Sequence, residues 1–156
     1  MQKCYLALGC FWKPEENFRS IPGILETEVG YAGGKKQDVT YEEVCKGDSG
    51  HAEVVKIIFD EKIISFEKIL ELFFKFHDPT QKDMQYPDIG SQYRSEIFFV
   101  DETQKKMAID IKNKFNENFD KKIETNISKI YNYCKAEEYH QKYIKKKTNM
   151  KNLVST

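Results

Sequence analysis

The passage from residue 3 to residue 16 constrains the fold most, because a strand pattern changes there directly into a helix pattern. Residues 3–8 have the composition of a short buried strand that is apolar on both faces. Pro14 suits the first turn of a helix, where its missing N–H removes no hydrogen bond. The passage therefore predicts that Cys10 lies at a strand-to-helix junction.

Cys10 has two interpretations in this position. Free backbone N–H groups and the dipole at a helix start stabilise anions, which lowers the pKa of a thiol and favours the nucleophilic thiolate. Phe11 and Trp12 follow at once and would then form an apolar receptor beside a reactive cysteine. The alternative is a small, inert thiol that ends a buried strand, as most free cysteines are buried. The passage alone leaves both interpretations open.

Length, charge and composition limit the class of protein. The chain has 156 residues with 25 basic and 25 acidic side chains. This length favours one domain with a sizeable core, and the balanced charge gives no reason to expect binding to nucleic acid or to an anionic membrane. No apolar run reaches the length of a membrane span, and no leader pattern is present. We expect a cytoplasmic monomer with reduced cysteines.

Periodicity and capping residues predict the other elements. Strands are expected at residues 24–31, 51–60, 96–100 and 123–130. Helices are expected after Cys10, with Pro14 in the first turn, and at residues 40–45, 66–77, 102–119 and 136–147. Thr40 and Ser65 are candidate N-caps. Residues 78–91 have little periodicity, and long segments of this kind are often functional. The order predicts an α+β fold, a two-layer sandwich with a mixed or antiparallel sheet around a split β-α-β, ferredoxin-like core.

The domain organisation is expected to be simple. Residues 1–147 are predicted to form a single catalytic domain, and residues 148–156 a polar, flexible tail. No internal repeat, low-complexity tract or linker divides the chain. The lysines at positions 145–147 are expected to be a solvated helix end near the negative end of its dipole.

Further segments put titratable groups where a strand or a loop begins. Glu53 opens an otherwise apolar strand, where desolvation would raise the pKa of its carboxyl and make it a candidate acid. Asp88 and Tyr93 precede another strand, and His140 lies on the predicted last helix. Each also has a structural interpretation: a solvent-facing strand end, a surface turn, and a histidine that is merely hydrogen-bonded.

Metal and nucleotide sites are not expected. The cysteines stand at positions 4, 10, 45 and 134 and the histidines at 51, 77 and 140, without a recognised zinc spacing or a C-x-x-C pair. Residues 30–34 (GYAGG) lack the Lys-Ser/Thr of a P-loop and do not match G-x-G-x-x-G. No metal or organic cofactor is predicted.

Short segments, taken in order, resemble one enzyme family. They are residues 9–12 (GCFW), 30–34 (GYAGG), 41–45 (YEEVC), 50–54 (GHAEV), 76–80 (FHDPT), 90–95 (GSQYRS) and 136–141 (AEEYHQ). The chain is similar to the A-type peptide-methionine sulfoxide reductases from residue 4 to about residue 144. No single segment is decisive, but the occurrence of all of them in this order is specific to the family. The resemblance implies reduction of the S epimer of methionine sulfoxide, free or in proteins, to methionine, in repair of oxidative damage.

The resemblance also implies which residues react. Cys10 would attack the sulfoxide sulfur, and loss of methionine would leave a sulfenic acid, the first reversible stage of thiol oxidation. Glu53 would protonate the sulfoxide oxygen. Tyr41 and Tyr93 would donate hydrogen bonds to the same oxygen, as in an oxyanion hole.

The surroundings of the reaction are implied in the same way. Phe11 and Trp12 would form the apolar pocket that receives the methyl group. Asp88 and His140 match positions that line or support the site. No cofactor is implied apart from an external thiol reductant.

The sequence departs from many members of the family in its C-terminal tail, which carries no recycling cysteine. Cys4 is a poor partner for Cys10, because six residues of strand span roughly 20 Å, whereas a disulfide needs Cα atoms within about 7 Å. Cys45 and Cys134 are distant in sequence and stay open as resolving thiols, and Cys134 is the stronger candidate because its segment carries His140 toward the site. The expected route uses an external thiol, from thioredoxin, glutaredoxin or glutathione.

Two other functions are kept as alternatives. A non-enzymatic thiol redox sensor would oxidise Cys10 without turnover, but such a protein needs no proton donor for a leaving oxygen. A thiol peroxidase would use the same cysteine with peroxide in place of a sulfoxide.

Overall fold

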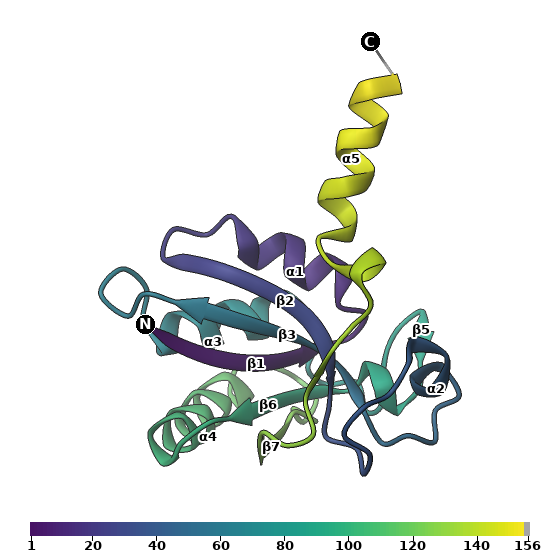
Figure 1. Cartoon of the computed structure of the whole chain (residues 1–156). Helices are drawn as coiled ribbons and strands as arrows, with labels where there is room; N and C mark the ends of the chain where they lie inside the picture. The colour runs from purple at the N-terminus through teal and green to yellow at the C-terminus, as the bar shows by residue number, and fades with distance from the viewer. Residues whose placement is uncertain (155–156) are drawn as a thin grey trace.

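The protein is built on a six-stranded, mostly antiparallel sheet, and the computed structural model describes residues 1–154 (Figure 1). The strands, in the order in which they lie side by side, are β7 (Asn126–Lys129), β6 (Ser95–Phe99), β1 (Gln2–Leu8), β3 (Ala52–Phe59), β2 (Ile24–Ala32) and β8 (Cys134–Lys135). Strand β3 lies between β1 and β2 and is antiparallel to both, whereas β6 and β7 are parallel.

Helices and short elements complete the fold. The helices are α1 (Trp12–Arg19), α2 (Tyr41–Cys45), α3 (Phe66–Lys75), α4 (Glu102–Asn116) and α5 (Tyr143–Val154). A small hairpin pairs β4 (Met84–Gln85) with β5 (Asp88–Ile89), and two 3₁₀ turns are η1 (Ser91–Tyr93) and η2 (Glu138–His140). The predicted α+β class with a mixed, mostly antiparallel sheet is confirmed.

Strand β1 contributes to the core on both faces of the sheet, as its composition predicts. Cys4, Leu6 and Leu8 belong to a large cluster that includes residues of α1, α3 and α4. Tyr5 and Ala7 belong to a smaller cluster on the opposite face. Figure 1 shows the segment after β7 crossing the face of the sheet on its way to α5. The sheet therefore has a helical layer on one face and mainly this segment on the other.

The chain segments that carry the predicted site lie together at one end of the central strands of the sheet. In an antiparallel sheet the end of one strand lies beside the start of its neighbour. Leu8, at the end of β1, pairs with Ser95 at the start of β6, and Tyr31, near the end of β2, pairs with Glu53 at the start of β3. The connections after β1 and β2 and before β3 and β6 therefore meet at this end of the strands.

Two helices begin where the sequence predicts. The Thr40 hydroxyl accepts the Glu43 N–H at 3.2 Å, and the Glu43 carboxylate accepts the Thr40 N–H at 3.4 Å, which is a capping box. The Ser65 hydroxyl caps α3 by accepting the Lys68 N–H at 3.0 Å. Because these bonds join residues only three positions apart, both helix starts can be predicted from the sequence.

The predicted helix at residues 136–147 is wrong, because this segment forms a 3₁₀ turn and α5 begins only at Tyr143. The Gln141 side chain accepts the Val29 N–H at 2.9 Å and donates to the Val29 carbonyl at 2.8 Å. Lys142 has φ +51°, which is outside the right-handed helical region. Bonds to β2 therefore prevail over the local helical pattern.

The end of the chain also differs from the prediction. Helix α5 extends to Val154, so residues 148–154 of the predicted tail are helical, and residues 155–156 lie outside the described residues. Figure 1 shows α5 projecting away from the body of the molecule. In the part of the chain that the structure describes, no helix has the length and apolar character needed to cross a membrane.

Candidate active site

Cys10 lies on the link between β1 and α1 and is half-buried. Gly9, just before it, has φ +94°, and a Cβ at this position would lie 2.9 Å from the Gln85 side chain. Glycine avoids both the strained backbone and the close contact. The turn therefore brings the β4–β5 hairpin, which contains Gln85, against the backbone next to Cys10.

The prediction that the helix start lowers the pKa of Cys10 is wrong. Burial and the charge of Glu53 raise the pKa of the Cys10 thiol to about 12, and the charge of Asp88 adds to the rise. The backbone N–H of Trp12 acts in the opposite direction but is outweighed. Burial disfavours the thiolate and the carboxylates repel it. Cys10 is therefore a neutral thiol near pH 7.

Glu53 lies at the start of β3 and is only 2% exposed. Its Oε1 atom accepts the N–H of Phe11 at 3.1 Å. Burial raises the pKa of the Glu53 carboxyl to about 7, assisted by the charge of Asp88 and opposed by hydrogen bonds from Phe11 and the Cys10 thiol. The predicted rise in pKa is confirmed. Glu53 can hold or release a proton near neutral pH, in contact with Cys10.

Two phenols reach the same region from different connections. Tyr41 is the first residue of α2, and Tyr93 is the last residue of η1. A hydrogen bond with the Cys45 thiol, followed by burial, raises the pKa of Tyr41 well above its usual value. Burial, followed by the charge of Glu53, raises the pKa of Tyr93 to about 12. Both phenols therefore stay protonated at neutral pH and are available as hydrogen-bond donors.

Asp88, on β5, completes the group of polar residues predicted for the site. Its charge raises the pKa of Cys10, Glu53 and Tyr93, and Asp88 and Cys10 line one cavity. The charges of Glu53 and Tyr93 act in turn on Tyr41. The structure thus brings all five residues together, although they come from three separate parts of the chain: the link after β1, the segment from α2 to the start of β3, and the segment before β6.

The two aromatic residues after Cys10 have different surroundings. Phe11 is 1% exposed, and its ring packs against Tyr31 and His140 with centroids 5.7 and 5.2 Å apart. Trp12 is only partly buried. The Phe11 ring therefore belongs to the core, while Trp12 retains a surface that a ligand can reach.

Two contacts fix the plane of the Trp12 indole. Its Nε1–H donates to Nδ1 of His140 at 3.0 Å, and its ring stacks on Tyr143 with centroids 3.8 Å apart and planes 10° apart. His140 is 1% exposed, and burial lowers its pKa, so it is neutral at pH 7. Because Nδ1 accepts, the ring proton is on Nε2. His140 lies on η2 and not on a helix as predicted.

Two acids that hold the C-terminal segment were not predicted. Glu137 accepts the Tyr31 hydroxyl at 2.9 Å and the Tyr41 N–H at 2.8 Å. Glu15 is 1% exposed and accepts the Lys142 N–H at 2.7 Å. No local signal reveals these bonds, since Tyr31 is 106 positions from Glu137 and Lys142 is 127 positions from Glu15.

Arg94 is a further residue whose role only the structure reveals. It donates to the Glu96 carboxylate at 2.7 Å, to the Ser91 carbonyl at 2.9 Å and to the Gly50 carbonyl at 3.0 Å. Arg94 therefore ties the connection that carries Tyr93 to the turn before β3. The sequence indicates a guanidinium before a strand but not its three partners.

The four cysteines are unpaired thiols. Cys4 is 0% exposed, and burial raises its pKa. Cys134 is half-buried on β8, with its Sγ 3.9 Å from the Val39 carbonyl oxygen. Cys45 is exposed at the end of α2 and is hydrogen-bonded to the Tyr41 phenol. Cys45 is therefore the candidate resolving thiol that touches a predicted site residue.

Among residues 1–154, no three His, Cys, Asp or Glu side chains gather as metal ligands.

Comparisons with known proteins connect this geometry to a family. Residues 2–156 match the family model described as peptide methionine sulfoxide reductase. Peptide methionine sulfoxide reductase MsrA of Pelagibacter ubique is 51% identical over 147 residues, which cover 94% of this chain and 100% of that relative.

Two solved structures of the Saccharomyces cerevisiae protein Mxr1 are also similar. Its reduced form has a TM-score of 0.89 at 38% identity, covering 93% of this chain and 84% of that chain. Its complex with Trx2 has a TM-score of 0.65 at 27% identity, covering 91% and 84%. Because the family model spans nearly the whole chain and the bacterial relative is 51% identical, the chain belongs to the A-type peptide methionine sulfoxide reductases, oxidoreductases that reduce methionine sulfoxide.

Proposed function

We propose that this chain reduces the S epimer of methionine sulfoxide, free or in proteins, with Cys10 as nucleophile and Glu53 as acid. The observation that carries the proposal is the contact between a half-buried thiol and a carboxyl whose pKa is raised to about 7 by burial. A group with this pKa exchanges a proton efficiently at neutral pH. Repair of oxidised methionine is the expected role.

The raised pKa of Cys10 requires a base within reach. The Glu53 carboxylate accepts a hydrogen bond from the Cys10 thiol. We propose that the thiol proton moves to Glu53 as the sulfoxide binds, which generates the thiolate only when a substrate is present. Neutral Glu53 then returns this proton to the sulfoxide oxygen. One carboxyl acts first as base and then as acid.

The chemical step balances without another reactant. The Cys10 thiolate attacks the sulfoxide sulfur while Glu53 protonates the oxygen, which forms a bond between the two sulfurs and a hydroxyl group on the substrate sulfur. The hydroxyl group then passes to the Cys10 sulfur as the sulfur–sulfur bond and the sulfur–oxygen bond of the substrate break. Thiol and sulfoxide become sulfenic acid and thioether, so Cys10 is oxidised as methionine is formed. Tyr41 and Tyr93 donate hydrogen bonds to the oxygen as negative charge develops on it, because their raised pKa values keep both phenols protonated.

The receptor for the methyl group is proposed to be the exposed part of Trp12, with the buried Phe11 ring behind it. The bond to His140 and the stack on Tyr143 hold the indole plane, which makes the wall rigid. His140 thus supports the pocket without touching the reacting atoms. Asp88 raises the pKa of Cys10 and of Glu53, which supports the proton exchange between them.

Regeneration of Cys10 is proposed to use an external thiol. The yeast relative Mxr1 has been solved in complex with Trx2, which supports thioredoxin as the reductant here, with glutaredoxin or glutathione as alternatives. The sequence contains no cysteine after Cys134. Two thiols reduce the sulfenic acid and release water, so no metal or organic cofactor is needed. The reaction is proposed for a cytoplasmic monomer in which residues 1–147 form one catalytic domain.

A more specific topology is also proposed within the α+β class. We propose that β1, α1, β2, β3, α3 and β6 form a split β-α-β core of the ferredoxin-like kind. The order β6-β1-β3-β2, with β3 antiparallel to both β1 and β2, supports it.

Turnover of a peptide that contains S-methionine sulfoxide, with dithiothreitol as reductant, tests the proposed function. The wild-type chain should release methionine, and Cys10→Ser should release none while its circular dichroism spectrum is retained. Substantial turnover by Cys10→Ser would contradict the mechanism. A sensor would give one equivalent at most, and a peroxidase would prefer peroxide over the sulfoxide.

Mass spectrometry after a single turnover without reductant tests the regeneration step. A sulfenic acid on Cys10 that dimedone traps supports the external route. A Cys10–Cys45 or Cys10–Cys134 disulfide would contradict it. Cys45→Ser and Cys134→Ser should each keep wild-type turnover with thioredoxin if neither thiol takes part.

A further inference from the structure

A cavity borders Cys10 on the side of the β4–β5 hairpin. It has a volume of about 380 Å³, within the range of ligand pockets. Its described lining residues are Leu8, Cys10, Lys13, Pro14, Phe76, His77, Gln85, Tyr86, Pro87 and Asp88. Trp12 and Glu53 are not among them. Apart from Cys10 and Asp88, the residues that line this cavity have no role in the proposed chemistry.

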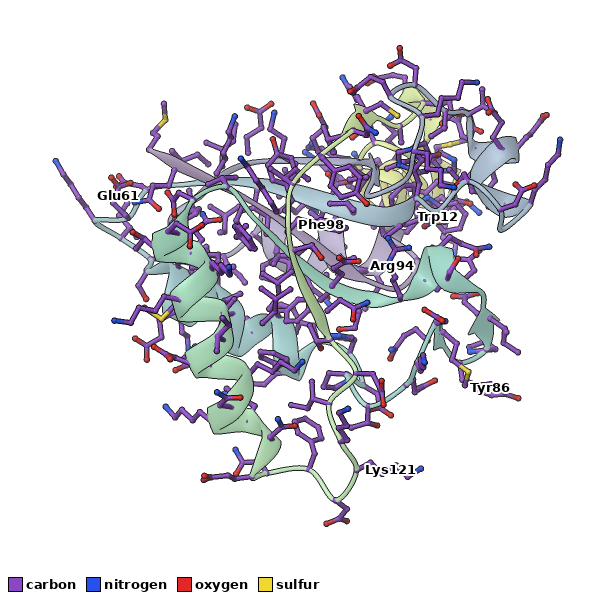
Figure 2. The ribbon with its side chains drawn as sticks, turned by 90° about the horizontal axis from the view of Figure 1, so that it is seen from below. Trp12, Glu61, Tyr86, Arg94, Phe98 and Lys121 are labelled. Carbon is purple, nitrogen blue, oxygen red and sulfur yellow. The ribbon has the colours of Figure 1, made fainter. Side chains whose placement is uncertain are left out.

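The β4–β5 hairpin forms one side of this cavity and carries two exposed apolar side chains, of which Tyr86 lines the cavity and Ile89 does not. Tyr86 is 73% exposed and Ile89 is 69% exposed. Figure 2 shows Tyr86 pointing outward from the rim of the molecule. Large apolar side chains that are gathered beside a site commonly mark a contact surface.

The hairpin is held in place by the rest of the chain. The Gln85 side chain accepts the Asp78 N–H at 2.8 Å and donates to the Asp78 carbonyl at 2.8 Å. The Tyr86 N–H donates to the Gln81 side chain at 2.8 Å. Close packing against Gly9 adds a further contact. The exposed side chains therefore stand on a preformed surface, which lowers the entropic cost of binding a partner.

The charges of the cavity suit a neutral occupant. Lys13 and Asp88 have opposite charges, and they line the same space. His77 is neutral at pH 7, because burial lowers its pKa to about 4. The other lining side chains are uncharged or apolar. A peptide segment, whose amide groups are neutral, adds no charge to this space.

We propose that this cavity and the side chains of Tyr86 and Ile89 bind the polypeptide segment that flanks the sulfoxide in a protein substrate. The occupant is an extended, apolar segment, which passes from Cys10 over the hairpin. This inference rests on the proposed function and adds a substrate class to it, namely sulfoxides within exposed apolar stretches of oxidised proteins.

The test compares two substrates with dithiothreitol as reductant. One is a short synthetic peptide with S-methionine sulfoxide between apolar residues, and the other is N-acetyl-S-methionine sulfoxide amide. For Ile89→Ser and Tyr86→Ser, the ratio of kcat/KM for the peptide to kcat/KM for the small sulfoxide should fall about tenfold, through KM, because a large apolar contact is lost. The matched control is Ile63→Ser, since Ile63 is 62% exposed and lies elsewhere.

Three results would overturn the proposal. They are an unchanged ratio in both hairpin variants, an equal fall in Ile63→Ser, and a defect that arises only when thioredoxin replaces dithiothreitol. The last result would assign the hairpin to the reductant. If the wild-type chain reduced neither sulfoxide, the proposed function would fail instead, so the two failures are distinguishable. Thermal unfolding of each variant verifies that it is folded.

Discussion

Cys10 lies between two regions that differ in how they are built. On one side, the closed side, are Glu53, Glu137, Gln141 and Lys142, whose polar groups are buried or partly buried and hydrogen-bonded to distant parts of the chain. On the other, the open side, is the β4–β5 hairpin, whose apolar side chains face solvent. Buried polar bonds fix atoms in place because breaking them leaves unsatisfied groups. The closed side therefore suits the reacting groups, and the open side suits a variable polypeptide.

The largest effect is expected from Glu53→Gln on the closed side. Loss of a positioned acid should slow sulfenic acid formation by about 10²- to 10⁴-fold. Single-turnover kinetics measure this step without the reductant. The control is Glu26→Gln, an exposed carboxyl on β2. Equal rates in both variants would remove Glu53 from the mechanism.

The same carboxyl should make stability depend on pH. Burial raises the pKa of Glu53 from 4.5 to about 7 in the folded protein, so the folded protein keeps a proton that the unfolded chain releases between these pH values. The free energy of unfolding should therefore fall by on the order of 3 kcal/mol as pH rises from 4.5 to 7.

Denaturant titrations of wild type and Glu53→Gln across this pH range measure the difference. The fall attributed to Glu53 should be missing from the variant, which cannot ionise at this position. Parallel curves for the two proteins would show that Glu53 is not desolvated as described.

Two adjacent acidic residues on α1 allow a buried hydrogen bond to be compared with a partly exposed ion pair in their contribution to stability. Glu15 accepts the Lys142 N–H and is 1% exposed, whereas Glu16 pairs with Arg19 at 2.6 Å on a partly exposed surface. Glu15→Ala should cost about 2 kcal/mol of stability, and Glu16→Ala less than about 1 kcal/mol. Chemical denaturation measures both. Fluorescence of Trp12, the only tryptophan, should change in Glu15→Ala alone, because the C-terminal segment that holds it loosens.

Arg94 links the segment that carries Tyr93 to the turn before β3. The planar guanidinium group, whose N–H groups reach three acceptors, is the feature to test. Arg94→Lys removes the geometry that reaches three acceptors at once, so kcat should fall about tenfold with little change in KM. Arg19→Lys, which alters a partly exposed ion pair, is the control. A change in KM alone, or the same loss in both variants, would argue against a positioning role for Arg94.

The smallest effect is expected on the stability of the open side. Ile89 is 69% exposed, so Ile89→Ser should change the free energy of unfolding by less than about 0.5 kcal/mol. A loss of 2 kcal/mol would mean that the hairpin is part of the folded core and not a free contact surface.

Much of the fold can be predicted from the sequence where local chemistry decides. The Thr40 and Ser65 caps satisfy backbone groups within three residues, so the starts of α2 and α3 are correct. The raised pKa of Glu53 was also predicted, since a carboxyl at the start of an apolar strand loses solvent wherever the strand is buried.

The failures occur where distant segments compete with a local pattern. The helix predicted at residues 136–147 is replaced by a turn, because Gln141 is bound to β2. The pKa of Cys10 is raised and not lowered as predicted, because the folded chain buries the thiol and brings Glu53 and Asp88 close to it. The sequence gives neither the burial nor these distances.

The sequence alone determined the α+β order of elements and the family, because apolar periodicity and short motifs are local properties. Only the tertiary structure decided that Cys10 is a neutral thiol in contact with Glu53, and that Trp12 rather than the Phe11 ring keeps an exposed surface. Ionisation and exposure depend on all neighbours in space. At Cys10 these neighbours come from β3 and the β4–β5 hairpin, which meet the end of β1 only when the sheet has formed.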